Sequence, residues 1–183
     1  MIQNKNPMLD LIENQAFFYN KPTPTIGLWI NLSEITEQMT IEALMVAKFP
    51  HISVEEIRCS NVEGIARFFY NPQLDKFNMW GWGRFMVGRV RHPEFESHLI
   101  ECYFEKIGVR QIGEVVNAYC GEYSSDEDFA KQTIEEIYGY EMPEAIRDTF
   151  DYKAFTDKLM DDHLSFKGQY FRIIPEDNSH CII

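Results

Sequence analysis

The sequence has no long apolar run and little cysteine. Within its 183 residues, no apolar stretch approaches the roughly 18 residues that a membrane-spanning helix requires. The N-terminus carries no basic region followed by a continuous apolar stretch, so we expect no signal peptide. The four cysteines form no CxxC pair, which favours free thiols in a reducing cytoplasm over a disulfide framework. We therefore expect a soluble, cytoplasmic protein.

Basic residues are also scarce. Seventeen Lys and Arg stand against 29 Asp and Glu, a net charge of −12. Such a chain lacks the basic footprint of nucleic-acid-binding proteins and is repelled by anionic membranes. The exception is segment 77–92, where aromatic residues alternate with Arg84, Arg89 and Arg91. Bases could stack there, but the same pattern is typical of a half-buried strand, so we expect no direct binding of nucleic acid.

No catalytic signature is present. The sequence contains no GxSxG elbow and no Cys–His signature, and the glycines of segment 77–92, spaced GxGxxxxG, match no dinucleotide or phosphate-loop fingerprint. The best metal candidates are His92, His98, Glu101 and Cys102, because His98 would share a helix face with the last two. Nothing else in the chain complements them. We expect no metal, no cofactor and no enzymatic activity.

The hydrophobic pattern predicts an α+β protein, an elongated chain of small α/β and helical modules. We interpret residues 1–25 as an N-terminal extension and 26–92 as an α/β module. Residues 93–121 are predicted to form a helical middle module, and residues 122–183 an acidic C-terminal α/β domain.

Local signals place elements inside the first two modules. Residues 25–32 predict a strand, and a helix with Ser33 as its N-cap follows. Residues 52–58 and 65–70 are predicted as further strands, and segment 77–92 as a twisted strand or hairpin. The middle module is predicted to hold two short helices.

The C-terminal domain carries several helix-end signals. They are Ser125 with Asp128 as a capping box, Gly139 as a C′ residue, Pro143 and Asp151 as the starts of two further helices, and a closing strand at 169–174.

Negative charge is what the chain has in abundance, and it is concentrated in residues 122–162. This stretch holds 13 carboxylates and four basic residues, a net charge of −9. Apolar residues recur through it at helical spacing, so we expect the carboxylates on the exposed faces of folded helices. The residues expected in the core are Phe129, Ile134, Ile137, Phe150 and Phe155. The carboxylates predicted to form a partner-binding surface are Glu122, Asp126, Glu127, Asp128, Glu135, Glu136, Glu141, Glu144, Asp148, Asp157, Asp161 and Asp162.

An acidic helix face has an ordinary explanation, which is simple solvation. Two features favour another one. Few lysines lie at i+4 to compensate the carboxylates, so like charges repel without local gain. The arrangement also persists across three consecutive predicted helices. The pattern is therefore compatible with a surface that imitates another polyanion or binds a basic protein.

The order of elements in residues 126–172 resembles the C-terminal domain of the ArdA-type antirestriction proteins. That family has an acidic helix of the form D-x-A-x-x-x-I-E-E, a Gly turn, a Pro-initiated helix, an aspartate–aromatic segment and a closing strand. A weaker similarity lies in the GLWINL strand at 27–32. The matching residues are Asp128, Ala130, Ile134, Glu135, Glu136, Gly139, Pro143, Asp151, Tyr152, Ala154, Phe155, Asp157, Lys158, Leu159, Tyr170 and Phe171.

The resemblance implies a non-catalytic protein of a mobile genetic element, such as a conjugative transposon, that mimics B-form DNA. Such a protein is dimeric through its C-terminal domain and occupies the DNA-binding groove of type I restriction-modification enzymes. Two other hypotheses stay open. One is an acidic adaptor that binds a basic partner without DNA-like geometry. The other is a metal protein centred on His98, Glu101 and Cys102, which bound metal would support.

Overall fold

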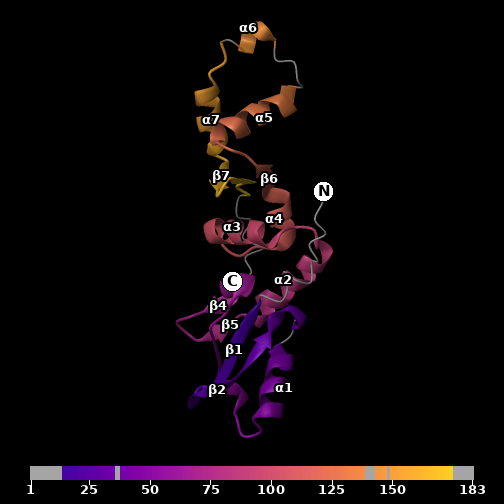
Figure 1. Ribbon diagram of the computed structural model, residues 1–183, viewed down its shortest axis with the longest axis vertical. Coiled ribbons are helices and arrows are strands. Elements are labelled where there is room, and N and C mark those ends of the chain that lie inside the picture. Colours follow the sequence, from indigo (N-terminus) through magenta and orange to yellow (C-terminus); the bar gives the residue numbers. More distant parts are fainter. Residues whose placement is uncertain (1–13, 36–37, 139–142, 148, 175–183) are drawn as a thin grey trace. The chain divides into compact units, whose positions relative to one another are not determined.

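Two separately packed units make up the part of the chain that the computed structural model describes, residues 14–35, 38–138, 143–147 and 149–174. The first unit contains the described residues up to Gly113, and the second begins at Glu114. The protein is mixed helix and sheet, 50% helical and 24% strand, as the α+β prediction requires. Figure 1 shows the elements along the chain.

The first unit combines a three-stranded antiparallel sheet with short helices. The sheet has the order β2-β1-β3, with β1 pairing Phe17 opposite Trp29 and Phe18 opposite Cys59. A second, two-stranded ladder joins β4 and β5. The elements are β1 (Gln15–Asn20), β2 (Thr23–Asn31), α1 (Gln38–Lys48), β3 (Ile57–Ser60), β4 (Tyr70–Asn71), β5 (Lys76–Phe77), α2 (Met79–Arg91) and α3 (Ser97–Ile107), with 3₁₀ turns η1 (Leu32–Glu34), η2 (Val54–Glu56) and η3 (Gly64–Phe69).

Trp82 on α2 is the centre of the first unit's core. Its side chain is fully buried, and its indole N–H donates to the carbonyls of Leu32, at 2.9 Å, and Ile35, at 3.1 Å. The rings of Phe69 and Phe85 lie 5.4 and 5.5 Å from it, as aromatic pairs prefer. The helix is thereby fixed to the turn that follows β2.

The prediction of a strand or hairpin at 77–92 is wrong for all but its first residues, because residues 79–91 form helix α2 and only Phe77 belongs to a strand, β5. Asn78 caps the helix by accepting a hydrogen bond from the N–H of Gly81 at 2.9 Å. The buried residues Met79, Trp82 and Met86 follow helical spacing. Alternating aromatics and arginines suggested a strand, but the cap and the buried face decide in favour of a helix.

Other predictions for the N-terminal half are also corrected. Residues 1–25 are not merely an extension, because β1 within them is the central strand of the sheet. Strand β3 begins only at Ile57, since η2 occupies residues 54–56 of the segment 52–58 predicted as a strand. Residues 65–69 form the 3₁₀ turn η3. Ser33 lies inside η1, whose cap is Asn31.

The second unit packs helices against a three-stranded antiparallel sheet of order β6-β8-β7. Helix α4 begins in the first unit and ends in the second. The two short helices predicted for the middle module are α3 and α4. The remaining elements are α4 (Ile112–Ala118), β6 (Tyr119–Glu122), α5 (Asp126–Tyr138), α6 (Glu144–Arg147), α7 (Tyr152–Met160), β7 (His163–Phe166) and β8 (Gln169–Arg172).

The cap at Asp151 is confirmed, and the capping box at Ser125 is confirmed in one of its two bonds, because Asp128 accepts from the N–H of Ser124 and not from that of Ser125. The Ser125 hydroxyl accepts a hydrogen bond from the N–H of Asp128 at 3.1 Å, and the Asp151 carboxylate accepts one from Ala154 at 2.9 Å. Gly139 lies outside the described residues. The closing strand is present as β8, but its hairpin partner β7 was not predicted. Lys167 and Gly168, both at positive φ, form the two-residue turn between them.

Two glycines offer a matched test of the packing in the first unit and at its boundary. A Cβ added at Gly88 would lie 2.4 Å from Cγ2 of the buried Ile112, whereas one added at Gly113 meets nothing within 4 Å. We predict that Gly88→Ala lowers the free energy of unfolding by about 1–3 kcal/mol through overpacking. Gly113→Ala should leave it unchanged or raise it by up to about 1 kcal/mol. Urea denaturation measures both. Equal stability of the two variants would contradict the packing described here.

Candidate partner-binding surface

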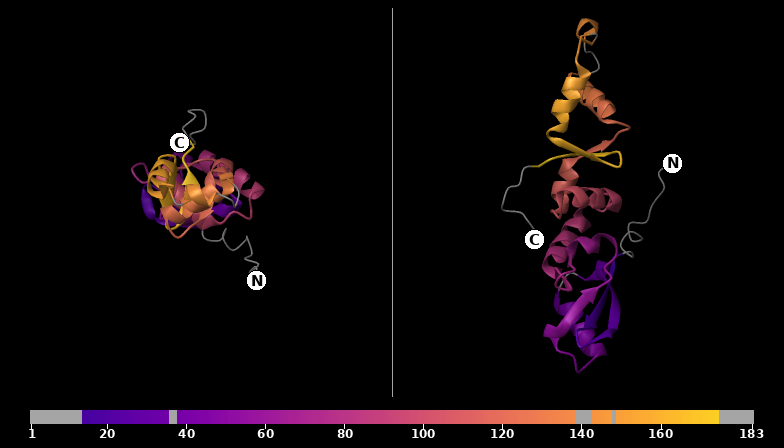
Figure 2. Two further views of the ribbon diagram at one scale, coloured as in Figure 1. Left: turned by 90° about the horizontal axis from the view of Figure 1, so that it is seen from above. Right: turned by 90° about the vertical axis from the view of Figure 1, so that its left-hand side faces the viewer.

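The negative charge of the protein is divided unequally between the two units. Residues 1–113 carry 11 basic and 13 acidic residues, a net charge of −2. Residues 114–177 carry 6 basic and 16 acidic residues, a net charge of −10. Almost the whole charge imbalance therefore belongs to the second unit, in which α5 and α7 pack side by side (Figures 1 and 2).

Three carboxylates lie in the first turn of α5, where backbone N–H groups favour negative charge. Asp126 accepts a hydrogen bond from the Tyr170 hydroxyl at 2.6 Å. Asp128 accepts from the N–H and the hydroxyl of Ser124, at 3.2 and 3.0 Å. These contacts fix the start of α5 and therefore the direction in which its acidic face points.

Little of the exposed charge is neutralised by neighbouring cations. Within the described part of the second unit the ion pairs found are Lys131 with Glu127, at 2.9 Å, and Lys158 with Asp161, at 2.8 Å. Each hydrogen bond and its partner's charge raise the pKa of the lysine. The exposed carboxylates of the described residues that take part in neither pair include Glu122, Glu135, Glu136, Asp157 and Asp162.

A cluster of aromatic side chains packs against the buried face of the acidic helix α5. The ring of Phe129 lies 4.7 Å from that of Tyr170 and 5.0 Å from that of Tyr123, and Phe129 and Tyr170 are buried. Burial, and then the hydrogen bond to Asp126, raise the pKa of Tyr170 to about 12. The strand β8 therefore anchors both the apolar and the charged side of α5.

The expected division between core and surface is confirmed in part. Phe129 and Ile134 are buried as predicted, whereas Phe150 and Phe155 are only half-buried. The prediction that Ile137 lies in the core is wrong, since its side chain is 63% exposed. Glu141, Asp148 and the side chain of Glu144 lie outside the described residues. Of the remaining predicted carboxylates Asp128 is half-buried, and those that are exposed are Glu122, Asp126, Glu127, Glu135, Glu136, Asp157, Asp161 and Asp162.

The candidate metal ligands on helix α3 contact other side chains or are buried. His98 Nδ1 lies 3.1 Å from a Glu96 oxygen, Glu101 accepts a hydrogen bond from Arg67 at 3.2 Å, and Cys102 is buried. Among the described residues, no three His, Cys, Asp or Glu side chains are grouped so that they could hold a metal ion. That the protein binds no metal stays a prediction.

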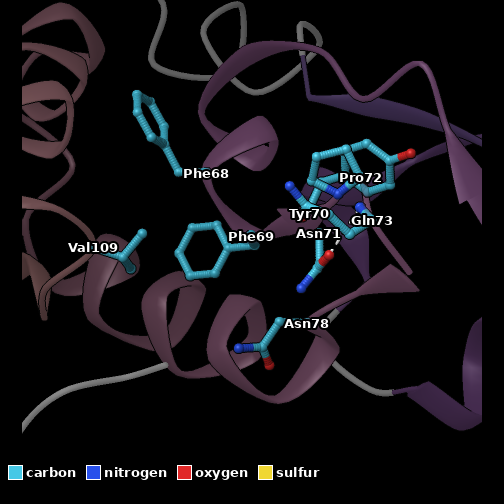
Figure 3. Close-up of a pocket in the computed structure, with 8 residues that line it drawn as sticks. All are labelled: Phe68, Phe69, Tyr70, Asn71, Pro72, Gln73, Asn78 and Val109. Carbon is cyan, nitrogen blue, oxygen red and sulfur yellow. Dashed lines mark hydrogen bonds between the residues drawn. The ribbon is translucent and has the colours of Figure 1, made fainter. Parts of the chain in front are cut away.

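Two pockets of the first unit are lined by aromatic and polar side chains. The one in Figure 3, about 280 Å³, places Phe68, Phe69 and Val109 opposite Tyr70. The Tyr70 hydroxyl donates to Asp75 at 3.1 Å, and burial, then this bond, raise its pKa to about 12. A second pocket, of about 380 Å³, is lined in part by Cys59, whose pKa is raised to about 12 by burial and then by Asp75. Such a thiol stays protonated at neutral pH and is a poor nucleophile.

Comparison of the chain with protein-family models, with curated proteins and with experimentally determined structures finds no match. In the described residues, no helix combines the length and the apolar character needed to cross a membrane.

The bond between Tyr170 and Asp126 generates a pH prediction. Between pH 10 and 12 an unfolded tyrosine ionises while folded Tyr170 stays protonated, so the free energy of unfolding falls with pH. Below pH 10 this contribution is fully present. We predict that the free energy of unfolding falls between pH 10 and 11 in both proteins, and that the fall is about 1 kcal/mol smaller in Tyr170→Phe than in the parent. Chemical denaturation at a series of pH values measures this, and parallel profiles for the two proteins would contradict it.

Proposed function

We propose that this protein is an antirestriction protein that mimics B-form DNA and occupies the DNA-binding groove of type I restriction-modification enzymes. The observation that carries the proposal is the acidic surface of the second unit. Most of its described exposed carboxylates lie on α5, at Asp157 on α7 and in the turn that follows α7, and they are largely unpaired by cations among the described residues. The resemblance of residues 126–172 to the C-terminal domain of ArdA-type proteins supports the same function.

The amount of charge fits the imitation of a short duplex. Duplex DNA carries one negative charge per about 1.7 Å of its axis, so a net charge of −10 corresponds to about 17 Å, or about five base pairs. A homodimer, which the resemblance implies, would present twice that charge. This length is a useful part of the site that the recognition subunit of a restriction enzyme covers.

Rigid support distinguishes this surface from a flexible acidic tail. Carboxylates on a helix anchored by Phe129 and Tyr170 keep fixed positions, as phosphates do on a duplex. Lysines and arginines of a DNA-binding groove can then pair with these carboxylates. No disordered segment has to become ordered on binding, and its ordering would cost binding free energy. In this proposal the protein binds the enzyme and excludes DNA from its groove, which needs no bond-breaking chemistry.

A cleavage assay with matched variants tests the proposal. The surface variant combines Glu135→Gln, Glu136→Gln and Asp157→Asn. The control variant combines Glu55→Gln, Glu94→Gln and Glu96→Gln, which remove the same formal charge from the first unit. Both sets of side chains are exposed, so neutralising their charges should change the free energy of unfolding little.

We predict that the parent inhibits DNA cleavage by at least one of a panel of type I enzymes. The surface variant should need about ten times more protein for half-inhibition, since exposed ion pairs contribute about 0.2–1 kcal/mol each. The control variant should stay within about twofold of the parent. Equal loss in both variants would assign the effect to net charge alone. Binding of the enzyme without displacement of its DNA would instead favour an acidic adaptor.

A further inference from the structure

A groove on helix α2 of the first unit differs in charge from the rest of this acidic protein. It has a volume of about 450 Å³, and its lining includes Trp80, Arg84, Val87 and Arg91 from one face of the helix, together with Gln111. No Asp or Glu is among the described residues that line it. The two charged side chains of the groove are therefore both positive.

The apolar part of the groove is exposed to an unusual degree. Trp80 is 63% exposed and Val87 54% exposed, on the side of the helix away from the buried Trp82. Gly83 and Gly88 also line the groove and leave room beside these side chains. Large apolar side chains gathered around a hollow, with polar groups at the rim, are typical of a protein interaction site.

The arginines of the groove are available to a partner. The Arg84 guanidinium lies over the Trp80 ring, 4.8 Å from its centre, which holds the two side chains together. Neither Arg84 nor Arg91 forms an ion pair with a carboxylate among the described residues. Each can donate to a carboxylate supplied from outside.

The matching chemistry is present on the chain itself, at the end of α5. Ile137 is 63% exposed there, and the preceding Glu136 is exposed as well. Glu135 lies two positions before Ile137 and therefore points toward the opposite side of the helix. An apolar side chain with a neighbouring carboxylate complements Trp80 and Val87 beside two arginines. We propose that the α2 groove binds the end of α5 of a second copy of this chain.

Such a contact joins two different surfaces, so it is heterologous and can add further copies. It is distinct from a symmetric dimer through the second unit alone. A nucleic-acid strand fits the groove less well, because two arginines on a protein of net charge −12 give weak attraction for phosphates. The inference does not rest on the proposed function, since it concerns how copies of the chain associate.

Sedimentation velocity of the full chain tests the proposal over a wide range of protein and salt concentrations. The groove variant is Arg84→Glu with Arg91→Glu, and the helix variant is Ile137→Asp. A control, Lys21→Glu with Lys48→Glu, makes the same charge change at exposed positions elsewhere in the first unit. For the parent and the control we expect a mass that rises with concentration above the 21.6 kDa monomer and falls back in high salt.

Mixing the two variants gives the sharpest result. Each variant alone should show at least tenfold weaker association than the parent. An equimolar mixture should regain one contact, because the intact α5 of the groove variant meets the intact groove of the helix variant. Continued association of the groove variant, failure of the mixture to regain a contact, or no association of the parent would each overturn the proposal. So would binding of a single-stranded oligonucleotide that the groove variant loses while self-association is unchanged.

Discussion

The packing of Phe129 against Tyr170 is the contact on which the acidic surface depends. Helix α5 carries five carboxylates and one lysine, and like charges on a helix destabilise it by a few tenths of a kcal/mol per pair. An aromatic side chain buries about 150–250 Å² and contributes several kcal/mol. Burial therefore outweighs repulsion, and the helix can present a dense negative charge in fixed positions. The hydrogen bond from Tyr170 to Asp126 ties the same strand to the charged side of the helix.

The sequence predicted those elements of the fold whose determining residues lie close together in the chain. The caps at Ser125 and Asp151 involve residues three apart, and both were predicted correctly. Helix α2 was not predicted, because its glycines and arginines resemble a twisted strand until Trp82 is seen bonded to the carbonyls of Leu32 and Ile35, 50 and 47 residues away. Strand β1 was missed for the same reason, since its partners in β2 and β3 are known only from the structure.

The candidate surface was predictable where helical periodicity applies. Burial of Phe129 and Ile134 and exposure of Glu135 and Glu136 follow directly from a period of 3.6 residues. Ile137 was misplaced because periodicity gives the face of a helix but not where the core beneath it ends. The division of charge between the units, −2 against −10, also required the structure, since the boundary at Gly113 lies within α4.

The salt dependence of binding to a type I recognition subunit tests DNA mimicry most directly. Affinity measured over a range of salt concentrations should fall steeply as salt rises, as DNA binding does. DNA and this protein should exclude each other from the subunit, and the slope of log affinity against log salt should become shallower when Glu135, Glu136 and Asp157 are neutralised. A slope that is unchanged by neutralisation, or simultaneous binding of DNA and this protein, would contradict mimicry.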